Sequence, residues 1–193
     1  MNLVRELHET LSEDSQLIIF SDDKILYDQE ENNYCFPIND LNKLSQDLSY
    51  LCIAENQNKK IYVIDVDSNE QVLGLFMDPK VVSFIDFRHL LGLIGLDNFQ
   101  LLSRASMLKT WNRNSQFCSQ CGKKNLFNQK EGAYVCECSK SPKYPSISPC
   151  VITLVHDEDR ILLGRSNFFP KNMFSTLAGF IEAGENAEQA LVR

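Results

Sequence analysis

The 193-residue sequence lacks the features of a membrane-spanning or exported protein. No apolar run in it reaches the ~18 residues that a membrane span requires. The amino-terminal residues MNLVRELHETLSEDSQ are polar and acidic and do not contain the apolar centre of a signal peptide. We therefore expect a cytoplasmic protein with no membrane partner.

Histidine is scarce, and internal repeats and low-complexity tracts are absent. The three histidines, His8, His89 and His156, lie in unrelated contexts. No Cys/His or Ser/His/Asp arrangement is apparent, so the sequence does not support nucleophilic catalysis by a side chain.

The cysteines are odd in number and unevenly spaced along the chain, which does not suit a disulfide framework. There are seven, of which three (Cys35, Cys52 and Cys150) are scattered among apolar residues, while the other four fall between residues 118 and 138. In a reducing compartment, clustered cysteines indicate a metal site and scattered ones indicate small core side chains.

The net charge of −7 is unevenly distributed. Residues 1–100 carry 7 basic and 18 acidic side chains, whereas residues 101–144 carry 8 basic and 2 acidic ones. The acidic excess argues against broad, sequence-independent binding of nucleic acid. The basic segment has two interpretations: it faces a phosphate-bearing ligand, or its lysines offset the charge of cysteine thiolates.

The pattern of apolar residues predicts an α+β protein. Short strand-like runs separated by Asp, Asn and Ser turns indicate a mixed α/β domain; they lie at 16–20, 24–27, 61–66 and 72–76. The segment 81–95 fits either a helix or a strand followed by a helix.

Residues 97–113 carry the clearest helix signal, with Asp97 as a possible N-cap and Gln100 three residues later. Its predicted apolar stripe is Phe99, Leu102, Ala105 or Ser106, Leu108 and Trp111. Core packing is the simplest role for Trp111, and a platform for a ligand is the alternative.

The stretch FCSQCGKKNLFNQKEGAYVCECSK has the spacing of a zinc ribbon. Cys118 and Cys121 form one pair, and Cys136 and Cys138 form the second after a short predicted hairpin. Four thiolates bind one Zn²⁺ tetrahedrally, and such a closed site is structural. Gly122 suits the tight turn after the first pair. The metal would supply much of the folding free energy of so small a unit.

The second cysteine pair departs from the common Cys-x2-Cys spacing, because residue 139 is a serine. Cys138 would then have to act as the fourth ligand, one residue early. The alternative is a ribbon that has lost its zinc.

The last part of the chain contains a spaced Gly-Glu-Arg pattern. After a proline-containing connector at 141–149 and a predicted hairpin at 150–166, Asn186 is positioned to cap a helix with Gln189. The pattern Gly179-x5-Glu185-x7-Arg193 resembles the first part of the Nudix box, Gly-x5-Glu-x7-Arg-Glu-apolar-x-Glu-Glu-x-Gly-apolar.

MFSTLAGFIEAGENAEQALVR, placed after a four-cysteine ribbon, resembles the NADH pyrophosphatase (NAD⁺ diphosphatase) subfamily of Nudix hydrolases. The resemblance implies three parts: an N-terminal α/β domain with its linking helix (1–113), a zinc ribbon (114–143) and an incomplete Nudix α/β/α sandwich (144–193). It also implies hydrolysis of NADH or NAD⁺, and of NAD-capped RNA ends, to nicotinamide mononucleotide plus AMP with Mg²⁺ or Mn²⁺. The metal-binding glutamates of the family helix follow the position of Arg193, so we expect a fragment that is inactive by itself.

The resemblance assigns roles to several residues. The backbone carbonyl of Ala178 matches a divalent-metal ligand, and Gly179, Glu185 and Arg193 support the box, the last two through a charge-assisted hydrogen bond. The predicted substrate contacts are Arg88, Glu131, Tyr144 and Phe180. Without the resemblance, Phe180 would be a core-facing strand residue, and Glu131 and Tyr144 ordinary surface; Glu182 and Glu188 fit a solvated face.

The resemblance further implies a homodimer, which unpaired strand edges would favour. The rival hypothesis is a non-catalytic zinc-ribbon module that binds RNA or a protein, supported by the basic segment.

Overall fold

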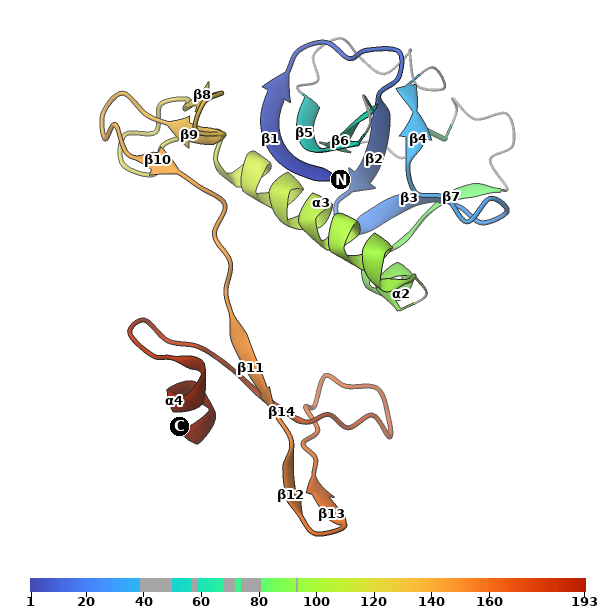
Figure 1. The fold of residues 1–193 in the computed structure, drawn as a ribbon, viewed down its shortest axis with the longest axis vertical. Helices are drawn as coiled ribbons and strands as arrows, with labels where there is room; N and C mark the ends of the chain where they lie inside the picture. The colour runs from blue at the N-terminus through green and yellow to red at the C-terminus, as the bar shows by residue number, and fades with distance from the viewer. Residues whose placement is uncertain (39–49, 57–58, 68–71, 74–80, 93) are drawn as a thin grey trace. The chain divides into compact units, whose positions relative to one another are not determined.

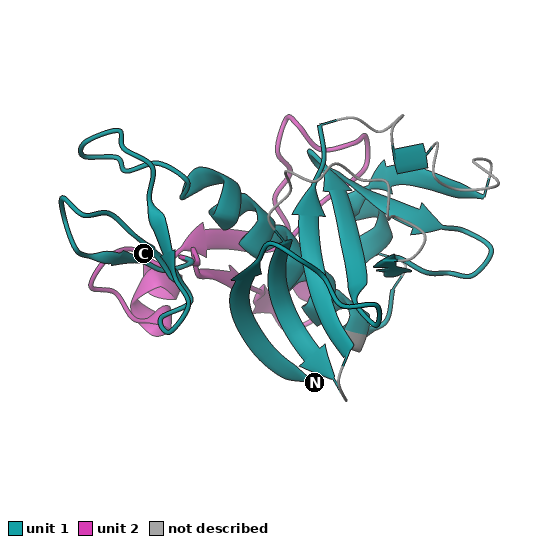
Figure 2. Cartoon of the chain, turned by 90° about the horizontal axis from the view of Figure 1, so that it is seen from above, with its two compact units in different colours: residues 1–145 teal, residues 146–193 magenta. Residues whose placement is uncertain are grey.

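A computed structural model describes residues 1–38, 50–56, 59–67, 72–73, 81–92 and 94–193. The chain forms two compact units, residues 1–145 (the first unit) and residues 146–193 (the second unit), coloured separately in Figure 2. The described elements form an α+β structure with a mixed sheet and few helices, as the sequence predicts. The finer division into parts 1–113, 114–143 and 144–193 stays a prediction.

The first unit is built on a seven-stranded sheet. Its strands are β1 (Asn2–His8), β2 (Gln16–Ser21), β3 (Lys24–Asp28), β4 (Phe36–Pro37), β5 (Tyr50–Asn56), β6 (Lys59–Asp65) and β7 (Val82–Asp86). The order is β1-β5-β6-β2-β3-β7, with β4 beside β2 (Figure 1). β2 and β6 are parallel and the other pairs are antiparallel. β1 therefore lies at an edge.

The runs at 16–20, 24–27 and 61–66 are strands, as predicted. The predicted strand at 72–76 is wrong where it is described, because Val72 and Leu73 are helical; residues 74–76 lie outside the described residues. Periodicity alone does not distinguish so short an apolar run from a buried helical turn. The segment 81–95 resolves into β7 followed by helix α2 (Phe87–Leu91).

The sheet is buried on both faces. Consecutive residues of a strand point to opposite faces, and β2 is buried throughout Leu17–Phe20. Ile18 and Phe20 share one apolar cluster with helix α3 (Leu96–Asn114), while Leu17 and Ile19 belong to a second cluster on the opposite face. Helix α3 thus covers one face of the sheet.

Two details of the α3 prediction are wrong. The helix begins at Leu96 with Gly95 as its N-cap, so Asp97 is not the cap. Phe99 is 42% exposed, whereas Leu101 is 8% exposed. The buried stripe follows the side of the helix that meets the sheet, and Leu101 lies on that side next to Leu102.

A three-stranded sheet follows α3, made of β8 (Leu126–Asn128), β9 (Ala133–Val135) and β10 (Pro142–Lys143). Trp111 of α3 packs its ring 5.4 Å from the Tyr134 ring and 6.4 Å from the Phe127 ring, measured between centroids. The Tyr134 hydroxyl donates to Asn112 Oδ1 at 2.7 Å. Trp111 is therefore a packing residue that joins the small sheet to the helix.

The second unit contains strands β11 (Cys150–Thr153), β12 (Val155–Asp157), β13 (Arg160–Leu162) and β14 (Leu177–Phe180), and helix α4 (Ala187–Val192). The predicted hairpin at 150–166 exists as β12–β13, while β11 pairs with β14. Helix α4 contacts β11 and begins with the predicted capping box of Asn186 and Gln189.

Among the described residues, no helix combines the length and the apolar character needed to cross a membrane.

Candidate metal centre and substrate-contact residues

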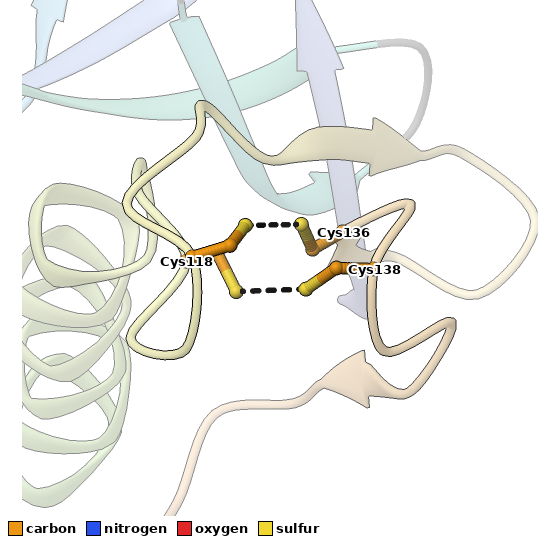
Figure 3. Close-up of side chains that lie close together, drawn as sticks. Cys118, Cys136 and Cys138 are labelled. Carbon is orange, nitrogen blue, oxygen red and sulfur yellow. Dashed lines mark hydrogen bonds between the residues drawn. The ribbon is translucent and has the colours of Figure 1, made fainter.

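The four clustered cysteines converge at the two ends of the β8–β9 hairpin. Cys118 and Cys121 precede β8, and Cys136 and Cys138 follow β9. All four Sγ atoms lie within 4.8 Å of one another. The sulfurs of Cys118 and Cys138 are 3.6 Å apart and those of Cys121 and Cys136 are 3.5 Å apart. Figure 3 shows the side chains of Cys118, Cys136 and Cys138 pointing inward from the two loops.

This geometry fits a tetrahedral zinc site. Zn–S bonds of about 2.3 Å place the sulfurs of a four-thiolate site about 3.8 Å apart. Cys138, and not Ser139, belongs to the group. The first loop turns tightly at Gly122, whose φ is +72°, and the Cys118 N–H donates to the Lys123 carbonyl at 2.8 Å. The cluster is compatible with zinc held by four cysteines.

The charges of the cluster also favour a cation. Backbone N–H groups of Cys121 and Gln120 lower the pKa of Cys118 to about 6, so this thiol ionises readily. The neighbouring sulfurs raise the pKa of Cys138 to about 12, because they disfavour a second thiolate beside the first. A divalent cation among the sulfurs would remove that repulsion. Four protein ligands would leave such a cation no open position, which is the arrangement of structural sites.

Two of the basic residues between 101 and 144 donate hydrogen bonds to backbone carbonyls within the first unit. Arg104 donates to the backbone carbonyls of Val4 and Ile53 at 2.7 and 2.9 Å. Lys109 is 5% exposed and donates to the Asp22 carbonyl at 2.5 Å. Neither is available to a ligand, whereas Lys123 and Lys124 are exposed near the cysteines.

The predicted substrate contacts Glu131 and Tyr144 lie side by side. The Tyr144 hydroxyl donates to the Glu131 carboxylate, and this bond raises the pKa of Tyr144. The Tyr144 side chain is 48% exposed. The guanidinium carbon of Arg5 lies 5.7 Å from the centroid of the Tyr144 ring. The sequence contained no signal for Arg5, since it sits in a polar stretch more than 120 positions away.

Arg88 lies elsewhere in the first unit. It is exposed, and its side chain makes no hydrogen bond or ion pair with any residue that the structure describes. It borders an open pocket of about 570 Å³ whose lining residues are Phe20, Asp22, Asp23, Asp86, Phe87, Arg88, Leu91 and Ser106. The structure does not join Arg88 to the Glu131–Tyr144 pair, and its role stays a prediction.

Hydrogen bonds join the residues of the second unit that match the Nudix box. Arg193 holds Glu185 with two hydrogen bonds, Nε to Oε1 at 2.7 Å and Nη2 to Oε2 at 3.0 Å, and it also donates to the Phe180 carbonyl. The Glu182 N–H donates to Glu185 at 3.0 Å. The Arg193 guanidinium and this backbone bond lower the pKa of Glu185 to about 2. Glu182 and Glu188 are exposed.

The other predicted box positions lie on β14. Ala178 and Gly179 pair in register with Ile152 and Val151 of β11. Phe180 is 64% exposed, so its ring does not face a core within the second unit. The Phe180 ring is therefore accessible, and it lies next to the loop that Arg193 holds through its hydrogen bonds to Glu185 and to the Phe180 carbonyl.

Comparison with known proteins gives relatives but no match to a model of a known family. The chain is 33% identical over 168 residues to a NAD-capped RNA hydrolase NudC of Pseudomonas aeruginosa, covering 86% of this chain and 57% of that protein. It is 31% identical over 176 residues to the protein of that name from Photobacterium profundum, covering 79% and 65%. Over 95 residues it is 44% identical to that of Pseudomonas syringae, covering 49% and 34%.

The fold and the cysteine cluster define an α+β protein with a four-cysteine ribbon. The relatives then confirm the resemblance to the NADH pyrophosphatase subfamily of Nudix hydrolases seen in the sequence: over 86% of its length the chain is similar to a curated protein named NAD-capped RNA hydrolase NudC. It spans less than two thirds of the length of these relatives.

Proposed function

We propose that residues 1–193 are part of a metal-dependent pyrophosphatase that cleaves NADH or NAD⁺, and NAD-capped RNA ends, into nicotinamide mononucleotide and AMP. The observation that carries the proposal is the identity of 33% to a NAD-capped RNA hydrolase over 86% of the chain. The Glu185–Arg193 hydrogen bonds support it, because this pair is the supporting element of the box.

In this proposal the second unit is the first part of a Nudix sandwich, and the ribbon carries zinc. Mg²⁺ or Mn²⁺, held by the Ala178 carbonyl and by glutamates that the family pattern places after Arg193, would neutralise pyrophosphate charge and activate the attacking water. The bidentate Arg193–Glu185 bond fixes the loop before α4, so that the helix enters the site at a defined angle.

The remaining residues bind and orient the substrate. Phe180 offers an exposed ring on which a base stacks, an interaction typically worth ~1–3 kcal/mol. Glu131 and Tyr144 offer a carboxylate and a hydroxyl that are already hydrogen-bonded to each other. Arg88 offers a guanidinium without a protein partner among the described residues. The cytoplasmic location and the homodimer remain part of the proposal.

The test compares the complete gene product with residues 1–193 on NADH and Mn²⁺, measuring AMP release. We expect the complete product to be faster by at least about 100-fold, because metal-binding and proton-transferring carboxylates contribute at least that factor. A chelator serves as the control and should abolish the activity. A complete product that is inert toward NADH, NAD⁺ and NAD-capped RNA would refute the proposed reaction, and comparable rates would refute the inactivity of residues 1–193.

The rival function is a non-catalytic ribbon that binds RNA or a protein. The exposed Lys123 and Lys124 favour it, whereas the internal positions of Arg104 and Lys109 reduce the charge available to such a partner. RNA binding by the complete product without any hydrolysis would support the rival.

A further inference from the structure

The free edge of β1 is covered by the turn between β8 and β9. β1 is the edge strand of the seven-stranded sheet. The side-chain amide of Gln129 donates to the Leu7 carbonyl at 2.5 Å and accepts from the Leu7 N–H at 3.2 Å. One amide side chain thus makes the two hydrogen bonds that a neighbouring strand would make. The ribbon hairpin is docked on the N-terminal sheet at this edge.

β1 is irregular where it meets the turn. Between Leu3 and Glu6 it advances three residues, while β5 advances two, from Ala54 to Cys52, so β1 contains a β-bulge. A bulge redirects side chains locally. The freed carbonyl of Val4 accepts from Arg104 of α3, which also binds Ile53 across the pair. Arg5 lies within this bulge.

Arg5 contacts both the backbone of the turn and two aromatic rings. Its Nε donates to the Gly132 carbonyl, and its Nη2 donates to the Glu131 carbonyl at 3.2 Å. Its guanidinium carbon lies 5.6 Å from the Trp111 ring centroid and 5.7 Å from that of Tyr144. A planar guanidinium suits this combination, since it stacks on aromatic rings while its edge donates hydrogen bonds.

Gly132 permits the close approach of the turn. Its φ is +55°, and a Cβ atom there would lie 2.7 Å from the Arg5 carbonyl oxygen. Any other residue would push the turn away from β1. The Arg5 contacts therefore depend on a backbone-to-backbone approach.

From these contacts we infer that Arg5 is the positioning residue that holds the Glu131–Tyr144 pair against the edge of the N-terminal sheet. It fixes the backbone that carries Glu131 and packs beside the ring of Tyr144. Arg5 itself is not assigned to the substrate. The consequence for substrate binding rests on the proposed function, in which Glu131 and Tyr144 contact the dinucleotide.

The first experiment tests the contacts of Arg5 with the turn and the two rings, and it does not require enzyme activity. Trp111 is the only tryptophan of the 193 residues, so its fluorescence reports the stacked guanidinium directly. We expect Arg5→Ala to shift the emission of Trp111, Arg5→Lys to shift it less, and Arg160→Ala, which removes an exposed arginine of the second unit, to leave it unchanged. A Trp111→Phe chain provides the blank. Unchanged emission in Arg5→Ala would overturn the inference.

The second experiment measures NADH hydrolysis by the complete gene product. Because Arg5 acts through binding residues, we expect Arg5→Ala to raise KM about tenfold and to change kcat by no more than about twofold, with partial rescue in Arg5→Lys. An altered Trp111 emission with an unchanged KM would overturn the link to the substrate pair. An inert wild-type protein would refute the proposed function and that link. The fluorescence result would still decide whether Arg5 holds the Glu131–Tyr144 pair in place.

Discussion

The two units contain similar apolar strands but bury them very differently. In the first unit, Ile18, Ile19 and Leu26 are each 0% exposed. In the second unit, Ile152 is 70% exposed and Ile161 is 56% exposed. Ala190 is the one buried apolar residue of 146–193, a segment that the structure describes completely. Apolar composition alone therefore does not produce a core.

The difference lies in the layers available to each sheet. The seven-stranded sheet has α3 on one face and a second apolar cluster on the other. The second unit has two separate two-stranded pairs and the six-residue helix α4. Two-stranded pairs are marginally stable without a further layer. In the proposed function the remaining part of the Nudix sandwich supplies that layer.

The largest expected effect concerns the ribbon, the part of the first unit that contains the four-cysteine cluster. Cys136→Ser removes a buried ligand of the cluster. Because structural zinc supplies about 10–16 kcal/mol of apparent folding free energy in small fingers, we expect the β8–β9 hairpin to lose amide protection while the seven-stranded sheet keeps it. Hydrogen exchange and metal analysis measure the two consequences.

Cys150→Ser is the matched control for this substitution, because Cys150 is exposed and lies outside the cluster. It should keep one zinc per chain. A full equivalent of zinc in the Cys136→Ser protein, or less than half an equivalent in the unmodified chain, would contradict the four-cysteine site.

A pair of leucine substitutions tests the comparison directly. Leu102 of α3 is 0% exposed and Leu162 of β13 is 52% exposed. We expect Leu102→Ala to lower the free energy of unfolding by about 2–5 kcal/mol, because it leaves a cavity under the helix. Leu162→Ala should stay within about 0.5 kcal/mol. Urea unfolding followed by Trp111 fluorescence measures the first value, and hydrogen exchange of β12–β13 the second. Equal losses would mean that the second unit has a core of its own.

The smallest effect concerns the Glu185–Arg193 bond. The pKa of Glu185 is lowered from 4.5 to about 2 in the folded chain, so the stability that this group contributes is present above pH 4.5 and is lost as the pH falls toward 2. Arg193→Gln removes the guanidinium and should return the pKa toward 4.5. Carbon-detected NMR titration of the Glu185 carboxyl measures it, with Arg160→Gln as the control. An unchanged low pKa in Arg193→Gln would assign the shift to the backbone N–H of Glu182.

Most local elements could be predicted, whereas several tertiary contacts could not. The strands at β2, β3 and β6 and the capping box of α4 follow from short patterns of apolar and capping residues. β1 was not predicted, because NLVRELH is polar and only partly buried as an edge strand. Phe99 was misplaced because helical spacing defines a stripe but not which side of it meets the sheet.

The sequence by itself determined the cysteine spacing, the Glu185–Arg193 spacing and the helix cap. Each depends on residues less than about 22 positions apart, and the short stretch of chain between them restricts their geometry. The tertiary structure decided which side chains meet across long separations. It brought Arg5 to Glu131, 126 positions away. It also left the apolar strands of the second unit exposed. These outcomes depend on which surfaces pack together, and that is a property of the whole fold and not of any segment.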